Sequence, residues 1–160
     1  MTRERSFTWQ DPMIGASAAR DLSGLEYLQA MQRGELPWPP IGQLMNFQPH
    51  EVEAGRVVFR FTPAEYHYNP IGSVHGGVAC TLLDSVMGCA VHSQLPKGVG
   101  YTTLELKVNY LRPMTAQTGE VFCEGRVIYL GGRQATAEGY IKDGAGKVYA
   151  HSTTTCMIFR

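Results

Sequence analysis

Hydrophobic and polar residues alternate along several segments of the chain after residue 44, as they do in strands that bury one face. Near residue 56 the alternation places Val57, Phe59 and Phe61 on one face, so we expect a first hairpin over residues 44–62. Four further strands are predicted over residues 103–111, 120–130, 133–142 and 147–159. Short glycine-rich connections at 131–132 and 143–146 suit antiparallel hairpins, so these four strands are expected to form a meander.

Between Pro70 and Pro96 the spacing of hydrophobic residues changes to that of a helix. Apolar residues occupy positions 78, 79, 82, 83, 86, 87, 90 and 91, which form a broad stripe on one long helix. A helix that is apolar over most of its surface must be covered by other elements. We therefore expect an α+β fold in which a mainly antiparallel sheet covers this helix.

The first 43 residues differ from the rest of the chain. Leu22, Leu25, Leu28 and Met31 form a short amphipathic stretch that predicts one helix ending near Gly34. The sequence Leu-Pro-Trp-Pro-Pro follows at 36–40 and predicts a rigid connector. We divide the chain into an N-terminal helical extension with its connector, residues 1–43, and one folded domain, residues 44–160.

Composition and charge narrow the class of protein. The length of 160 residues suits one domain, and 44% hydrophobic residues against 18% charged ones can build a core. Fourteen Lys and Arg balance fourteen Asp and Glu, so no net positive charge attracts nucleic acid. No secretory signal opens the chain, and no segment reaches the ~18 apolar residues of a membrane span. We expect a cytoplasmic protein that binds neither nucleic acid nor membrane.

The cysteines and histidines give no sign of a metal site. Cys80, Cys89, Cys123 and Cys156 form no Cys-x-x-Cys pair, so we expect them to be small hydrophobic residues, buried in a protein of a reducing compartment. The five histidines show no metal-binding spacing. Neither a Gly-rich phosphate loop nor a Gly-x-Ser-x-Gly serine elbow occurs. We expect no metal and no cofactor.

Asp84 is the residue that most needs an explanation, because it lies between Leu83 and Val86 in the apolar helix. Burial removes the water shell of a carboxylate and makes it a better base or nucleophile than a solvated one. The alternative is a structural aspartate that accepts a hydrogen bond from a nearby hydroxyl, such as that of Thr81 or Ser85.

The predicted helix opens with His75, Gly76 and Gly77. The first N–H groups of a helix have no partner within it and carry partial positive charge, so they can stabilise an oxyanion. Glycine leaves room for a substrate carbonyl to approach the backbone. The alternative is that the two glycines only let the helix approach the sheet. Asn69 precedes a proline, and this pair commonly starts a turn.

The segment Asn69-Pro-Ile-Gly-Ser-Val-His75-Gly76-Gly77, followed after six residues by Asp84, resembles the hotdog thioesterases of the phenylacetate-degradation type. These enzymes are related to the 4-hydroxybenzoyl-CoA thioesterases, and the resemblance covers residues 44–160. It implies a hotdog fold, which is a curved, mainly antiparallel sheet wrapped around one long central helix. It also implies an acyl-CoA thioesterase, which hydrolyses the thioester to a free acid and CoA.

The resemblance further implies roles for individual residues. The N–H of Gly76 polarises the thioester carbonyl, and Asp84 acts either as general base on a water or as the nucleophile. Asn69 lies against the water or the substrate carbonyl. Thr103, on the strand after the helix, orients the water or the carboxylate. Thr102 is the alternative, because a slip of one residue reverses the face to which a strand side chain points.

Contacts around this centre follow from the same resemblance. His75 is expected to shape the oxyanion loop rather than to act as the base. Arg112, and Arg133 beside Gly132, lie near predicted strand ends, where they either bind the CoA phosphates or are ordinary surface charges. The Tyr-His-Tyr sequence at 66–68 either lines the acyl pocket or only packs the loop.

Hotdog domains of this type associate, so the resemblance implies a homodimer or homotetramer whose active sites take residues from both chains. The acyl group is left open between aromatic and medium-chain groups. Two other functions are kept as alternatives. One is a hotdog dehydratase or hydratase that acts on a hydroxyacyl thioester, and the other is a module that binds acyl-CoA without catalysis.

Overall fold

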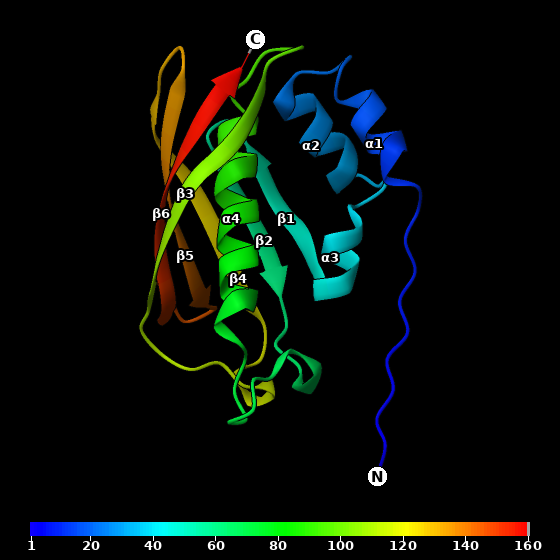
Figure 1. The fold of residues 1–160 in the computed structure, drawn as a ribbon, viewed down its shortest axis with the longest axis vertical. Coiled ribbons are helices and arrows are strands. Elements are labelled where there is room, and N and C mark those ends of the chain that lie inside the picture. Colours follow the sequence, from blue (N-terminus) through cyan, green and yellow to red (C-terminus); the bar gives the residue numbers. More distant parts are fainter. Residues whose placement is uncertain (160) are drawn as a thin grey trace.

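A six-stranded sheet covers one long helix in the computed structural model, which describes residues 1–159 (Figure 1). The helix is α4 (Gly76–His92). The strands are β1 (Phe47–Glu53), β2 (Arg56–Phe61), β3 (Gly100–Tyr110), β4 (Val121–Leu130), β5 (Gln134–Asp143) and β6 (Val148–Phe159). Two short 3-10 turns, η1 (Glu65–His67) and η2 (Ala116–Thr118), lie in the loops. The predicted α+β architecture with a central helix is confirmed.

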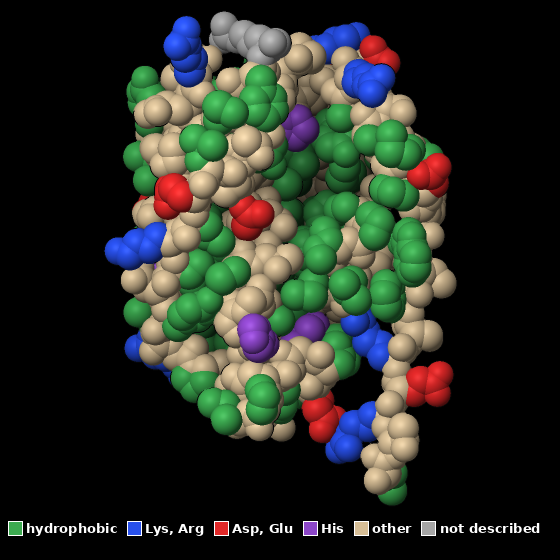
Figure 2. Space-filling view, viewed as in Figure 1, with side chains coloured by type: hydrophobic (Ala, Val, Ile, Leu, Met, Phe, Trp, Pro, Cys, Tyr) green, Lys and Arg blue, Asp and Glu red, His purple; other side chains and the backbone are tan. Residues whose placement is uncertain are grey.

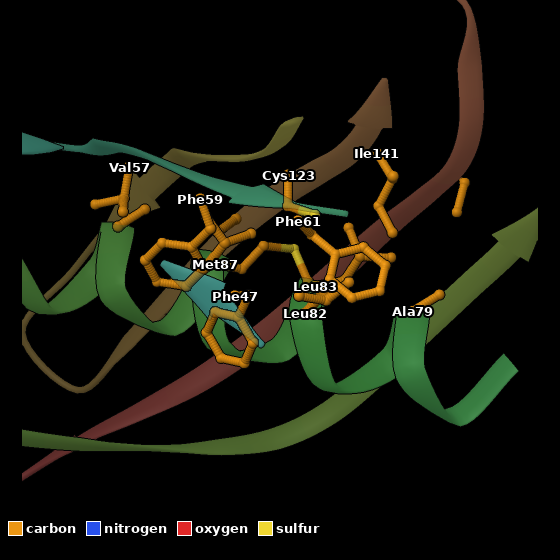
Figure 3. Packing of buried hydrophobic residues seen from close by; sticks show 14 of the residues in the cluster. Phe47, Val57, Phe59, Phe61, Ala79, Leu82, Leu83, Met87, Cys123 and Ile141 are labelled. Carbon is orange, nitrogen blue, oxygen red and sulfur yellow. The ribbon is translucent and has the colours of Figure 1, made fainter. Parts of the chain in front are cut away.

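Helix α4 packs against the sheet through the apolar stripe that the sequence predicted. Leu82, Leu83 and Met87 are fully buried and meet aromatic side chains of β1 and β2 (Figure 3). Gly125 of β4 lets the sheet approach the helix, because a Cβ atom there would lie 2.6 Å from the carbonyl oxygen of Val86. Burial of this interface removes apolar surface of both the helix and the sheet from water, which is the main force that stabilises the fold.

The strand order is β1-β2-β4-β5-β6-β3, and every neighbouring pair is antiparallel. The predicted hairpin of β1 and β2 is confirmed. The predicted four-strand meander is wrong at its first step, because β3 pairs with β6 and not with β4. Helix α4 connects β2 to β3, which is the strand at the opposite edge of the sheet from β1. Strands β2 and β3 therefore run in the same direction. Strands β4, β5 and β6, which form a true meander, fill the space between them.

Three short helices precede the sheet, where the hydrophobic pattern predicted one. Helix α2 (Gly24–Gln32) is the predicted helix, and it begins with a capping box between Ser23 and Glu26. Helix α1 (Pro12–Ala18) begins after a cap by Asp11, and α3 (Pro40–Met45) begins within the Pro-rich connector. Proline tolerates the first helical turn, where its missing N–H has no partner to lose, so the connector is partly helical. Figure 1 shows these helices beside β1 and α4.

The cysteines are all free thiols. Cys123 and Cys156 are buried as predicted, whereas Cys80 and Cys89 of α4 are only partly buried. Burial raises the pKa of the Cys89 thiol to about 12, so this side chain is not a thiolate at neutral pH. Within residues 1–159, no helix is long and apolar enough to cross a membrane.

Candidate active site

Asp84 of α4 meets Thr103 of β3. The Thr103 hydroxyl donates a hydrogen bond of 2.8 Å to Oδ1 of Asp84, and both side chains are half-buried. Thr102 is exposed, so Thr103 is the threonine that faces the helix. The alternative donor Thr81 gives its hydroxyl to the carbonyl oxygen of Gly77 at 2.9 Å. The Asp84 carboxylate is therefore held in place by a hydroxyl of the sheet.

An apolar pocket of about 280 Å³ opens beside this carboxylate, and we call it the Asp84 pocket. Helix α2, the connector with α3, the sheet and α4 all contribute to its wall. Figure 2 shows a hollow with mainly hydrophobic side chains between the N-terminal helices and α4. The lining residues are Tyr27, Leu28, Met31, Trp38, Pro39, Ile41, Phe47, Phe59, Asp84, Ser85, Cys89, His92, Tyr101 and Thr103. Such a lining suits the hydrocarbon part of an acyl group.

The start of α4 has the geometry of an oxyanion site. His75 is the N-cap, and its Nδ1 accepts a hydrogen bond of 2.8 Å from the N–H of Gly77. The neutral imidazole therefore carries its proton on Nε2. Among the residues 1–159, no acceptor is hydrogen-bonded to the N–H of Gly76. One backbone donor at the positive end of the helix is thus available to a ligand.

Tyr110 holds the start of this helix in place, and no pattern in the sequence predicted this role. Its hydroxyl donates to the carbonyl oxygen of Gly76 at 3.1 Å and lies 3.0 Å from Sγ of Cys80. The hydrogen bond with Cys80 raises the pKa of Tyr110 to about 12, so the hydroxyl stays protonated and can donate. Because Tyr110 ends β3, it attaches the helix start to one end of this strand.

Asn69 organises the loop before the helix. Its Oδ1 accepts from the N–H groups of Ile71 and Ser73, at 3.0 and 3.2 Å, and its Nδ2 donates to the Ser73 hydroxyl at 3.1 Å. The side-chain amide is thus used within the loop of its own chain.

A second pocket, of about 510 Å³, surrounds the helix start and is called here the helix-start pocket. His75, Gly76 and Arg112 line it, and Arg112 also donates to the carbonyl oxygen of Val148 at 2.6 Å. Gly132 and Arg133 lie in the turn between β4 and β5, at the other end of β6. A single chain therefore does not bring the three residues predicted for CoA together.

The two pockets are also separated within one chain. Gly76 and Asp84 are eight residues apart on α4, which at ~1.5 Å per residue is about 12 Å along the helix axis. A thioester carbonyl next to one of these groups is too far from the same chain's other group to contact it. The predicted catalytic residues thus form two half-sites, one with Asp84 and Thr103 and one with Gly76, His75 and Asn69.

The aromatic residues before the motif pack the loop and do not line the Asp84 pocket. Tyr66 lies under Arg5, whose guanidinium carbon is 4.1 Å from the ring centre. His67 is buried between the N–H of Ala64 and the carbonyl oxygen of Met45, at 3.0 Å each, and burial lowers its pKa. The pocket's aromatic residues come instead from distant segments such as residues 27, 38 and 101, which no local pattern links.

Comparison with known proteins gives consistent matches. The sequence model of the thioesterase superfamily matches residues 71–150, which is half of the chain. A candidate esterase of Saccharolobus solfataricus is 30% identical over 120 residues, which cover 75% of this chain and 84% of that protein. A candidate esterase of Halobacterium salinarum is 42% identical over 69 residues, but the match spans only 44% of that protein.

Solved structures agree with this assignment. A candidate thioesterase of Ralstonia eutropha, described as related to phenylacetic acid degradation, has a TM-score of 0.74 and 30% identity, over 82% of this chain and 98% of that one. A Streptococcus mutans protein bound to acetyl-CoA has a TM-score of 0.65 and 24% identity, over 71% of this chain and 89% of that one. The predicted hotdog fold and the resemblance to the phenylacetate-degradation type are confirmed.

Proposed function

Because the chain belongs to the thioesterase superfamily, we propose that it hydrolyses acyl-CoA thioesters to a free acid and CoA. The observation that carries this proposal is the hydrogen bond from Thr103 to Asp84 at the wall of an apolar pocket. A carboxylate held in one position beside space for an acyl group can act on the carbonyl carbon of a thioester. The acetyl-CoA bound to the S. mutans neighbour supports CoA as the leaving group.

In the proposed reaction, Asp84 either deprotonates a water that attacks the thioester carbonyl or attacks the carbonyl carbon itself. Thr103 keeps the carboxylate in place, and the N–H of Gly76 stabilises the negative charge that develops on the carbonyl oxygen. Positioned general bases typically contribute ~10²- to 10⁴-fold, and one oxyanion donor ~10²- to 10³-fold. Asn69 and His75 support this donor by holding the loop and the first turn of α4.

We further propose that two chains share each site. Strand β3 is at the edge of the sheet, where unpaired N–H and C=O groups can join a second chain. Tyr110 attaches Gly76 to one end of β3, and Thr103 holds Asp84 near the other end. Antiparallel pairing of two β3 strands about a twofold axis brings the Tyr110 end of one chain next to the Thr103 end of the other. The two half-sites then face each other across the dimer.

The same pairing accounts for the residues proposed to bind CoA. Arg112 is at the Tyr110 end of its chain, whereas Gly132 and Arg133 follow β4 at the opposite end. In an antiparallel dimer these ends become neighbours, so Arg112 of one chain and Arg133 of the other can both reach the phosphates of one CoA. Arginine forms strong charge-assisted hydrogen bonds with phosphate.

Release of free thiol from a panel of acyl-CoA substrates tests the reaction, with Asp84→Ala measured in parallel. We expect the wild type to release thiol and the variant to lose at least about a hundredfold in kcat, as expected for a lost base or nucleophile. Equal hydrolysis by both proteins would contradict the assignment of Asp84. Tight binding without any release would favour the binding module, and formation of an enoyl product would favour a dehydratase.

A mixed dimer tests the shared site. Gly76→Pro removes the proposed donor, because proline lacks the N–H, and proline is tolerated at the first helical position after the extended His75. A Cβ atom at position 76 would lie 3.0 Å from the Tyr110 hydroxyl, so Gly76→Ala, which keeps the N–H, is the control for this contact and should retain more activity than Gly76→Pro. Gly76→Pro and Asp84→Asn chains should each be inactive alone. Combined in one dimer, they restore one intact pair of half-sites and regain activity. Absence of any recovery, when native mass spectrometry shows that mixed dimers form, would contradict sharing.

A further inference from the structure

The N-terminal segment builds a large part of the Asp84 pocket. Six of the fourteen lining residues precede residue 44, namely Tyr27, Leu28, Met31, Trp38, Pro39 and Ile41. They come from α2, the connector and α3, which lie outside the part of the chain that the family model matches. The residues that shape the pocket are therefore separate in sequence from the residues proposed to react.

Trp38 is held in this wall by a hydrogen bond and by contacts with two other rings. Its indole N–H donates to the carbonyl oxygen of Phe47 at 2.8 Å. Its ring meets those of Phe47 and Phe59 edge to face, with centroids 5.7 and 5.4 Å away. Gly42 leaves room for the ring, because a Cβ atom there would lie 1.9 Å from Nε1 of Trp38. The indole is thus a fixed wall rather than a side chain that swings aside.

The pocket's size and charge restrict what it can hold. Its volume of about 280 Å³ is roughly twice that of an apolar protein cavity of ~150 Å³ that accepts benzene. Of the described residues that line it, Asp84 is the one acidic or basic side chain besides His92. Burial lowers the pKa of His92, so this imidazole is neutral at physiological pH. Apart from small polar groups such as the hydroxyls of Ser85 and Thr103, the remaining wall is mainly hydrocarbon and aromatic surface.

We propose that Trp38 closes the Asp84 pocket and limits the acyl group to a compact, uncharged one, about the size of a single ring with a short linker or a short aliphatic chain. This inference rests on the proposed thioesterase function. The acyl group would extend from the carbonyl near Asp84 toward the indole, so the N-terminal segment sets acyl length while the motif sets the reaction. Trp38 is a specificity residue that touches the substrate's hydrocarbon and not its reacting atoms.

The test compares kcat/KM over a series of straight-chain acyl-CoA substrates from butanoyl to hexadecanoyl. Trp38→Ala should raise the ratio of long-chain to short-chain kcat/KM by about tenfold or more, since one methylene in a hydrophobic pocket is typically worth that much. Ile41→Trp fills the pocket from α3 and should lower the same ratio. Trp9→Ala is the matched control, because Trp9 is exposed and outside the pocket, and its profile should equal that of the wild type.

Binding of S-alkyl-CoA thioethers of the same chain lengths separates this inference from the proposed function. These compounds lack the reactive carbonyl, so calorimetry reports the pocket alone. Suppose that the wild type hydrolyses no acyl-CoA and that Trp38→Ala prefers longer thioethers than the wild type does. This result would refute the proposed thioesterase function and support the role of Trp38 in limiting acyl length. If Trp38→Ala and Ile41→Trp are both folded by circular dichroism and both keep the wild-type chain-length profile, Trp38 does not limit acyl length. The absence of thioether binding by the wild type would also contradict this role.

Discussion

Replacement of Thr103 by valine is the most direct test of how the carboxylate is held. Valine has nearly the shape of threonine but cannot donate the 2.8 Å hydrogen bond to Asp84. A hydrogen bond to a charged group contributes roughly 1.5–3 kcal/mol. If that energy orients Asp84 in the transition state, its loss corresponds to about a 10- to 150-fold decrease in kcat, because ~1.4 kcal/mol is one factor of ten.

Thr103→Ser keeps the hydroxyl and should retain most of the activity. Thr102→Val is the matched control, because this exposed neighbour makes the same chemical change without touching Asp84. Steady-state thiol release measured for the three variants gives kcat and KM separately, and a positioning role predicts that kcat falls more than KM rises. Wild-type kcat in Thr103→Val, or an equal loss in Thr102→Val, would refute the role of this hydrogen bond.

Three further predictions concern stability and are checked by urea unfolding. Gly42→Ala and Gly125→Ala should each cost roughly 1–3 kcal/mol, because a Cβ atom would lie 1.9 Å from Trp38 and 2.6 Å from the backbone of α4, respectively. Gly144→Ala, where nothing lies within 4 Å, should change stability by less than about 0.5 kcal/mol. Burial lowers the pKa of His67 from 6.5, so the unfolded chain binds a proton that the folded chain rejects. The free energy of unfolding should then fall as the pH decreases below 6.5, and His67→Asn should weaken this dependence.

The local pattern predicted the elements well, and the long-range pairing less well. The apolar stripe on α4 and the alternation in β2 depend on neighbouring residues, so the sequence shows them directly. The pairing partner of β3 depends on where the chain returns to the sheet after a helix of seventeen residues. No turn residues in the sequence indicate that position. The two additional N-terminal helices were missed because each has only six or seven residues, too few for a helical period to stand out.

The candidate site also has residues that the sequence predicted and residues that only the structure reveals. Asp84 was found because a charge conflicts with its context in an apolar helix, whereas the role of Gly76 was predicted from its place at a helix start together with the resemblance to the hotdog thioesterases. The structure shows which residues hold Asp84 and Gly76 in position. Thr103 could be chosen over Thr102 only once the face of β3 was known, and Tyr110 and Trp38 act through contacts with residues 34 and nine positions away, respectively. Such contacts leave no periodic trace in the sequence.

The residues proposed to react, in the motif at 69–84, are separate in sequence from the N-terminal residues that form the wall of the Asp84 pocket. Substitutions in the two segments should therefore have different effects. The motif lies in the loop before α4 and on that helix, and substitutions there act on the reacting groups. The wall around Trp38 belongs to a segment that contacts the domain through β1 and α4. Among the described residues, this segment contributes no hydrogen bond to Asp84 or Gly76. Changes in this segment can therefore alter the acyl pocket without disturbing the carboxylate, the oxyanion donor or the edge of β3. On this reasoning, chains with the same motif but different N-terminal segments should share the reaction and differ in the acyl group they accept.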